Sequence, residues 1–305
     1  MTQRMDKLDI EILSRLLNNC RTPDSQIGKE IGISGVAVKS RIQKMIEQKV
    51  IENFTLKIEP PVLGYSVLYF VVIGKELGDI LDKIQLVGEQ FFVVPCIGGI
   101  TVCSIVVKEN PEHAVKIAKN ILRDVRVLSI FEAKSPEIRS DLTKTDIWII
   151  DILLNEPRLK IEEIAKISGF STKTVARSLD KLQNDEAIQF TLIYNPKRMG
   201  KYIPFTILVS VDCDVKTTLS KLEKKFENYF LQKPFVHLDK IVVFLYSDDI
   251  YKIDELSQKV HEIDGIQSVD LFIPKEINFP QKWVKNTIEH AKKSKRLHLM
   301  TEIHS

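Results

Sequence analysis

Several features that mark membrane, exported and metal-binding proteins are missing from this sequence. No apolar run reaches the roughly 18 to 20 residues that a helix needs to cross a bilayer, and the amino terminus is polar, unlike a secretory signal. The four cysteines do not have the spacing of a metal site, so buried thiols are the better interpretation, even for Cys96 and Cys103. These absences predict a cytoplasmic chain with no membrane contact and no bound metal.

Signatures of catalysis are equally scarce. The sequence has no phosphate-binding G-x-x-x-x-G-K loop and no recognisable pairing of a nucleophile with a base. His113 and His237 are the only histidines before position 260, and His237 stands beside Asp239 in a predicted turn, where such residues are usually solvated. We therefore expect no enzymatic activity, no catalytic residues and no cofactor.

What the sequence does contain is the composition of an ordinary globular protein. Its 305 residues are 44% apolar and 28% charged, enough for about two to four domains with cores of their own. The net charge of +3 is concentrated near the end of the chain, because residues 275–305 hold seven Lys or Arg and three Glu, a net charge of +4. The rest of the chain is close to neutral.

One supersecondary unit occurs twice in the chain. Asp9 to Arg21 reads DIEILSRLLNNCR, and Asp146 to Arg158, 137 positions later, reads DIWIIDILLNEPR without a gap. The register continues beyond these segments, with identical residues at Gly32/Gly169, Ser34/Ser171, Val38/Val175, Lys44/Lys181 and Ile51/Ile188. A long period repeated only twice indicates a duplicated domain rather than a solenoid.

Each half opens with three predicted helices, recognised by apolar residues at three- and four-residue steps. Gly32 and Gly169 suit the left-handed turn that ends a helix, and the serines two residues later suit helix caps. Two helices joined by such a turn form a helix-turn-helix. The predicted helices span residues 8–17, 24–31 and 35–48 in the first half, and 147–154, 161–167 and 172–185 in the second.

A strand-like segment follows each third helix, Val50 to Ile58 and Ala187 to Tyr194. We expect a two-stranded hairpin in each half, which makes each unit a winged helix-turn-helix. Beyond Pro60 and Pro196 the pattern changes to strand, helix, strand, strand, helix, strand, the order of the ferredoxin-like fold.

The predicted fold class is therefore α+β, with two winged helix-turn-helix domains, each followed by a ferredoxin-like β-α-β-β-α-β domain. Ser135-Pro136-Glu137 is the natural hinge between the halves. The predicted domains are residues 1–60 and 141–196 for the two winged helix-turn-helix domains, 61–135 and 197–275 for the two ferredoxin-like domains, and 276–305 for a basic C-terminal helix or tail.

This ordered series resembles the Lrp/AsnC family of prokaryotic regulators. The shared pattern is D-x-x-I-L-x-x-L-x-x-x-x-R, then G-[IF]-S-x-x-x-V, a V-I strand and x-P-x-x-[LM]-G, and it covers nearly all of residues 5–275, twice over. The resemblance implies transcription regulation through double-stranded DNA, with the ferredoxin-like domain handling assembly and small-molecule effectors. Family members usually carry one unit and dimerise, so this chain looks like a fused pseudo-dimer; pairing of two such chains as a homodimer stays open.

The third helix of each half is the candidate DNA-reading element. Such a helix needs its start and one face free of core packing, with short polar or basic side chains that reach base edges and phosphates. Solvated charges explain the same residues, but the helix-turn-helix context favours DNA binding. The candidates are Ser34, Gly35, Val36, Lys39, Ser40 and Gln43, flanked by Arg41 and Lys44, in the first half, and Ser171, Thr172, Lys173, Ala176 and Arg177, followed by Lys181, in the second.

The two candidate faces differ in charge. Asp180 stands where the first half has Gln43, and Asp185 and Glu186 close the second helix. Carboxylates near the phosphate backbone oppose binding. We therefore predict that the first half binds DNA more strongly and that the halves read unequal half-sites.

The effector site is less clear from the sequence. Single-unit members of the family carry a Gly-x-x-Asp element between the second and third strands of the ferredoxin-like domain. Here the first half has Gly98 and Gly99, with Thr101 where an acid is expected, and the second half has Asp239 without a glycine. The glycines suit either a close approach of ligand to the backbone or a plain hairpin turn, and the turn is favoured.

The C-terminal segment is not required by the resemblance. Residues 281–296 predict a helix with Trp283 on an apolar side and lysines on the other. It either packs its Trp on the protein and presents lysines to phosphate, or is a solvated terminus.

Two other functions stay open on the same architecture: a siroheme decarboxylase-like enzyme, which needs clustered His, Arg and Tyr residues, or an assembly protein that does not bind DNA.

Overall fold

A computed structural model describes residues 5–74, 77–108, 110–133, 141–212, 214–236 and 239–302, with side chains as far as residue 293. The predicted hinge Ser135-Pro136-Glu137, and Cys213 and His237, lie outside the described residues. Within them, no helix combines the length and the apolar character that a bilayer crossing needs.

Three helices open each half, as the apolar periodicity predicts. Gly32 and Gly169 end the second helix of each half in left-handed conformations, with φ of 77° and 75°. Ser34 and Ser171 cap the third helices by accepting hydrogen bonds from the amides of Ala37 and Thr174. The helices are α1 (Lys7–Asn18), α2 (Asp24–Ile31) and α3 (Gly35–Glu47), and α6 (Lys144–Asn155), α7 (Ile161–Ser168) and α8 (Thr172–Asn184).

The hairpin expected within each half is wrong. Each third helix leads into a single strand, β1 (Ile51–Ile58) or β6 (Ile188–Tyr194), and these two strands pair with each other in an antiparallel two-stranded sheet. The physical reason is length: a short 3-10 helix, η1 (Pro60–Leu63), follows β1 almost at once and leaves no chain for a returning strand. Each wing strand therefore finds its hydrogen-bond partner in the other half.

The two ferredoxin-like domains are confirmed. Their sheets have the strand orders β3-β4-β2-β5 and β10-β7-β9-β8, in which all pairs are antiparallel. The elements are β2 (Ser66–Ile73), α4 (Leu77–Gln85), β3 (Glu89–Pro95), β4 (Ile100–Val107), α5 (Pro111–Ile121) and β5 (Arg126–Ala133), then β7 (Ile203–Val211), α9 (Val215–Phe226), β8 (Phe230–Val236), β9 (Lys240–Ser247), α10 (Ile250–His261) and β10 (Ile266–Phe272).

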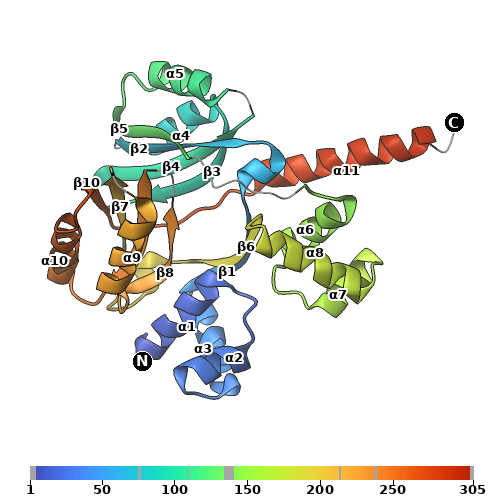
Figure 1. Ribbon diagram of the computed structural model, residues 1–305, viewed down its shortest axis with the longest axis horizontal. Coiled ribbons are helices and arrows are strands. Elements are labelled where there is room, and N and C mark those ends of the chain that lie inside the picture. Colours follow the sequence, from blue (N-terminus) through green and yellow to red (C-terminus); the bar gives the residue numbers. More distant parts are fainter. Residues whose placement is uncertain are drawn as a thin grey trace.

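The hydrophobic cores cross the boundary between the halves. The core of the first helix-turn-helix includes Tyr194 and Leu231 from the second half, and the core of the second includes Leu56 and Ile58 from β1. A further cluster joins Val71 of one ferredoxin-like sheet to residues of the other. Figure 1 shows the resulting arrangement, in which the strands β1 and β6 run between the two helical units. The halves are packed as one intertwined structure.

A long helix, α11 (Lys282–Glu302), ends the described chain and extends past the second helical unit (Figure 1). Trp283, Val284 and Ile288 are buried in the same core as α6. The Trp283 ring lies edge-on to Tyr65, with ring centroids 5.4 Å apart. Of the two alternatives left open for this segment, the structure therefore shows the one in which Trp283 packs on the protein.

Candidate nucleic-acid interface

Helix α3 presents one polar face, as its apolar spacing predicts. Val38, Ile42 and Met45 are buried beneath the helix. Because these three anchor it, the opposite side lies open: Gly35 and Lys44 are half-buried, and the exposed residues are Ser34, Val36, Lys39, Ser40 and Gln43.

Arg41 differs from its predicted neighbours because it is held by carboxylates. Its Nη1 donates to Asp9 Oδ1 at 2.7 Å and to Asp6 Oδ2 at 2.9 Å. Only 26% of the Arg41 side chain and 8% of the Asp9 side chain are exposed, so this pair joins α3 to the start of α1 rather than facing solvent. Lys39 is thus the more accessible cation of the two.

Helix α8 repeats this arrangement with different residues. Ser171, Thr172, Lys173 and Arg177 are exposed, whereas Ala176 and Lys181 are half-buried. Lys181 Nζ lies 3.0 Å from Asp146 Oδ2 and 2.6 Å from the Asp141 carbonyl oxygen. Like Arg41, Lys181 therefore has a carboxylate partner at the start of its helical unit.

Asp9 and Asp146 are equivalent, buried residues with equivalent tasks. Each completes a capping box at the start of the first helix of its half and also binds the third helix. In the first half that second contact comes from Arg41. In the second half the contact with the third helix comes from the Ser178 hydroxyl and from Lys181. Ser178 occupies the position equivalent to Arg41. The contact between this aspartate and the third helix is therefore present in both halves, although the residues on the third helix differ.

Hydrogen bonding shifts the pKa of these carboxyl groups. Burial disfavours the charged form of Asp146, but the Ser178 hydroxyl and the Thr143 amide donate to it and hold its pKa below the usual value. For Asp6, burial is likewise outweighed by hydrogen bonds from the Asp9 amide and Arg41, and the pKa is lowered. Both groups are therefore more acidic than in the unfolded chain.

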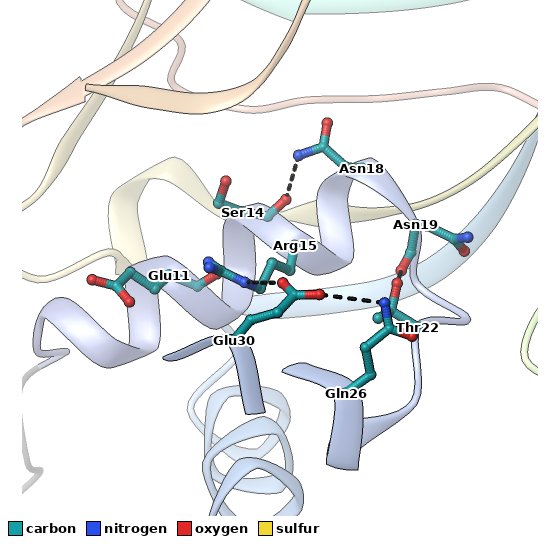
Figure 2. A network of polar contacts seen from close by, with 8 residues as sticks. All are labelled: Glu11, Ser14, Arg15, Asn18, Asn19, Thr22, Gln26 and Glu30. Carbon is teal, nitrogen blue, oxygen red and sulfur yellow. Dashed lines mark hydrogen bonds and ion pairs between the residues drawn. The ribbon is translucent and has the colours of Figure 1, made fainter. Parts of the chain in front are cut away.

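A polar network fixes α2 against α1 on the solvent side of the first unit (Figure 2). Arg15 Nε donates to Glu30 Oε2 at 2.8 Å, and Gln26 donates to the other carboxylate oxygen at 3.3 Å. The positions equivalent to Arg15 and Glu30 in the second half hold Ile152 and Ile167. The second unit therefore replaces an ion pair with apolar side chains, of which Ile167 is 60% exposed.

Close helix packing distinguishes the first helix-turn-helix. A Cβ at Gly35 would lie 2.9 Å from the Ser25 Cα, and a Cβ at Gly28 would lie 2.5 Å from the Ile33 carbonyl oxygen. The equivalent positions of the second half are Thr172 and Ala165. Helices α2 and α3 thus approach at a distance that only glycine permits, whereas α7 and α8 do not require it.

Two arginines connect the helical units directly. Arg21 Nη1 donates to the Pro157 carbonyl oxygen at 2.7 Å, and Arg158 Nη2 lies 3.5 Å from Asp24 Oδ1. Arg21 also stacks over Phe190, and Arg158 over Phe54. The sequence carried a signal for these contacts, because Arg21 and Arg158 are identical in the aligned repeats, but periodicity alone gave them no role.

The residues considered for an effector lie in two separate places. Gly98 and Gly99, with φ of 80° and 75°, form the tight β3–β4 turn, and Thr101 is buried in β4. The chain after β10 covers this turn, since the Ile97 amide donates to the Ile273 carbonyl at 2.9 Å. Asp239 lies before β9 in the other sheet, 3.5 Å from Lys240 Nζ.

The described residues contain no group of three or more His, Cys, Asp or Glu side chains arranged to hold a metal ion. Cys20, Cys96 and Cys103 are buried free thiols, as expected, and burial raises the pKa of each to about 12.

Two segments of the chain match known domain families. Residues 5–46 match the AsnC-type helix-turn-helix domain, and residues 142–189 match a winged helix-turn-helix DNA-binding domain. These are the segments that form α1–α3 and α6–α8.

Relatives from archaea are similar over parts of the chain. It is 41% identical over 88 residues to the HTH-type transcriptional regulator LrpA of Pyrococcus horikoshii, covering 28% of this chain and 60% of LrpA. It is 46% identical over 55 residues to the HTH-type transcriptional regulator LysM of Sulfurisphaera tokodaii, covering 18% of this chain and 39% of LysM. The chain therefore spans less than two thirds of the length of these curated relatives.

Solved structures with similar chain traces include two kinds of protein. The siroheme decarboxylase NirDL is 12% identical, with 94% of this chain and 100% of that chain covered and a TM-score of 0.47. Escherichia coli AsnC is 23% identical, with 46% of this chain and 99% of that chain covered and a TM-score of 0.31.

Two helix-turn-helix units, each followed by a ferredoxin-like domain, define a duplicated helix-turn-helix protein. The chain carries an AsnC-type helix-turn-helix domain and a second, winged helix-turn-helix domain, and over part of its length it is similar to the transcriptional regulator LrpA.

Proposed function

We propose that the chain is a sequence-specific DNA-binding transcriptional regulator in which one polypeptide supplies both helix-turn-helix units. The observation that carries the proposal is the open polar face of α3 and α8 in a chain whose relatives are named transcriptional regulators. Lys39 on α3, and Lys173 and Arg177 on α8, are exposed cations at the start or middle of their helices. Such cations neutralise DNA phosphates, and the neighbouring hydroxyl and amide groups reach base edges.

The two units act as a fused pseudo-dimer in this proposal. The antiparallel pairing of β1 with β6 and the contacts of Arg21 and Arg158 support it, because they fix one unit relative to the other within the chain. A homodimeric member of the family needs two chains for the same task. Here the pairing is intramolecular and independent of protein concentration.

The arms are unequal in this proposal. Gln43 and Asp180 occupy equivalent positions, and both are exposed. A carboxylate at this place repels the phosphate backbone, so we propose that the second arm binds its half-site more weakly.

A reciprocal exchange at these positions tests both DNA binding and inequality. We expect Asp180→Gln to tighten binding to a duplex selected from genomic DNA by about two- to fivefold at fixed salt, and Gln43→Asp to weaken it by a similar factor. Fluorescence anisotropy of labelled duplex measures both. Lys233→Gln, an exposed change in β8 away from α3 and α8, is the control. If neither exchange alters the affinity, α3 and α8 are not the DNA-reading helices.

Lys39→Ala and the pair Lys173→Ala with Arg177→Ala extend this test. Arg41 is left unchanged because its loss would release Asp9 and confuse a lost phosphate contact with a damaged fold.

An absorbance titration with siroheme tests the enzyme alternative, and a saturable spectral change would favour that alternative over the regulator.

A further inference from the structure

A pocket of about 860 Å³ lies between the first ferredoxin-like domain and α11. Its walls come from the loop before β3, the end of β4, the start of α5 and one side of α11. The volume is in the range of small-molecule sites. The pocket touches Glu89 at the start of β3 and Val107 at the end of β4, whereas the Gly98-Gly99 turn joins the opposite ends of these strands. It is therefore separate from that turn.

Nitrogen donors and apolar side chains share the lining of the pocket. Lys108, His113 and His290 bring an ammonium group and two imidazoles from three different elements. Leu86 and Ile117, which are 74% and 36% exposed, bring apolar surface. One carboxylate, that of Glu89, belongs to the same lining.

The polar groups at the α11 side are held in place. The Tyr65 hydroxyl lies 2.8 Å from Thr287 Oγ1, and Thr287 donates in turn to the Trp283 carbonyl oxygen at 2.7 Å. Lys108 Nζ stands 5.0 Å from the centre of the Tyr65 ring. Among the described residues, no carboxylate lies within ion-pair distance of Lys108, so its charge is available to a ligand.

We propose that this pocket binds an organic monocarboxylate with an apolar body, and that α11 transmits its binding to the second helix-turn-helix. The ligand carboxylate accepts hydrogen bonds from Lys108 and His290, and its apolar part covers Leu86 and Ile117. Glu89 disfavours a second negative charge on the ligand, which selects a monoanion over a phosphate ester.

Transmission rests on two different sides of the same helix. Asn286 and His290, four residues apart on α11, line the pocket, while Ile288, on the other side of the helix, is buried in the core that contains α6. Two residues beyond His290, Lys292 forms an ion pair with Asp151 of α6, and its Nζ stands 4.0 Å from the centre of the Trp148 ring. A shift of α11 on ligand binding therefore changes the surroundings of Trp148.

Ligand binding and transmission are properties of the chain without DNA. Only their use in regulation rests on the proposed function. The test therefore contains no DNA, and its failure is distinguishable from a failure to bind DNA.

Isothermal titration with octanoate, octan-1-ol and octylammonium, all below their micelle concentrations, tests the site. We expect saturable binding of octanoate at least about tenfold tighter than that of the other two probes. Lys108→Met with His290→Ala weakens octanoate binding by about tenfold or more. Lys116→Met on α5 and Lys285→Met on α11, exposed lysines outside the lining, are matched controls that leave it unchanged. No saturable binding, equal binding of the three probes, or insensitivity to the double substitution overturns the proposal.

Trp148 and Trp283 are the only tryptophans of the chain, so fluorescence tests the transmission. In Trp283→Phe, octanoate shifts the emission of Trp148, and the further change Lys292→Met abolishes the shift without altering octanoate affinity. Hydrogen exchange of the α6 amides gives a second readout in the unaltered chain. If neither the Trp148 emission nor α6 exchange responds to saturating octanoate, α11 transmits nothing.

Discussion

Asp9 and Asp146 keep their place in the duplicated unit although their partners differ. Each is a buried carboxylate that completes a capping box and binds the third helix of its half. A buried charge without a partner is strongly destabilising, so the partner on the third helix is required even when its identity changes. Arg41 and Lys181, which as isolated sequence positions resemble phosphate contacts, are therefore explained by the fold.

Arg41→Met tests this structural role. It leaves Asp9 buried without its guanidinium, and we expect the free energy of unfolding to fall by about 2 kcal/mol in urea titrations, less than for a fully buried pair because Arg41 is partly exposed. Lys39→Met on the same helix is exposed and should change it by less than about 0.5 kcal/mol. Equal effects of the two substitutions would show that Asp9 does not depend on Arg41.

The lowered pKa of Asp146 predicts a pH dependence of stability. The pKa of an aspartate carboxyl group in the unfolded chain is about 3.9, and the pKa of the folded Asp146 is lower. Its contribution is therefore fully present well above the unfolded value and is lost as the pH falls through the folded value. The stability advantage of the wild type over Asp146→Asn should be large at neutral pH and shrink below about pH 4, as measured by urea midpoints. An advantage independent of pH contradicts this assignment.

Among the secondary-structure elements, the helices and the ferredoxin-like order could be predicted because they follow from local spacing. Val38, Ile42 and Met45 lie on one side of α3 whatever the tertiary structure around the helix. Gly32 ends α2 because glycine adopts the left-handed conformation without strain. The pairing of β1 with β6 could not be predicted in this way. A short strand carries no mark of its partner, and the nearest candidate in sequence, a hairpin within the unit, had no chain to form it.

The same distinction applies to the candidate site. The exposed residues of α3 and α8 follow from helical periodicity, and the structure shows most of them open to solvent. The ion pairs of Arg41 and Lys181 depend on which helix packs opposite, and so does the pocket beside α11. Contacts between elements distant in sequence need the tertiary structure.

Helix α11 requires a different experiment from simple truncation. Trp283 and Ile288 fill a core shared with the second helix-turn-helix, so removal of residues 276–305 would damage that core. We expect Trp283→Ala to lower the free energy of unfolding by about 3 to 5 kcal/mol in urea titrations. Lys282→Ala with Lys285→Ala, two exposed positions, should leave it within about 0.5 kcal/mol. A small effect of Trp283→Ala would show that α11 is not part of the core.

At the scale of the whole molecule, duplication has joined two helix-turn-helix units in one intertwined chain. Core residues of each helix-turn-helix come from both halves, and Arg21 and Arg158 tie the units across the repeat. The exposed faces of α3 and α8 differ more between the two halves than these core and arginine contacts do, as Gln43 and Asp180 show. A fused pair of this kind no longer has to treat its two arms alike, because each arm is encoded separately.

The central claim is that this chain reads DNA sequence with two unequal arms. Its most direct test is to incubate the purified protein with sheared genomic DNA at about 0.15 M salt and to sequence the bound fragments. The account predicts a recurrent motif made of two different half-sites, which weakens when Lys39 is replaced by alanine. Bound fragments without a common motif, or no bound DNA, would contradict it.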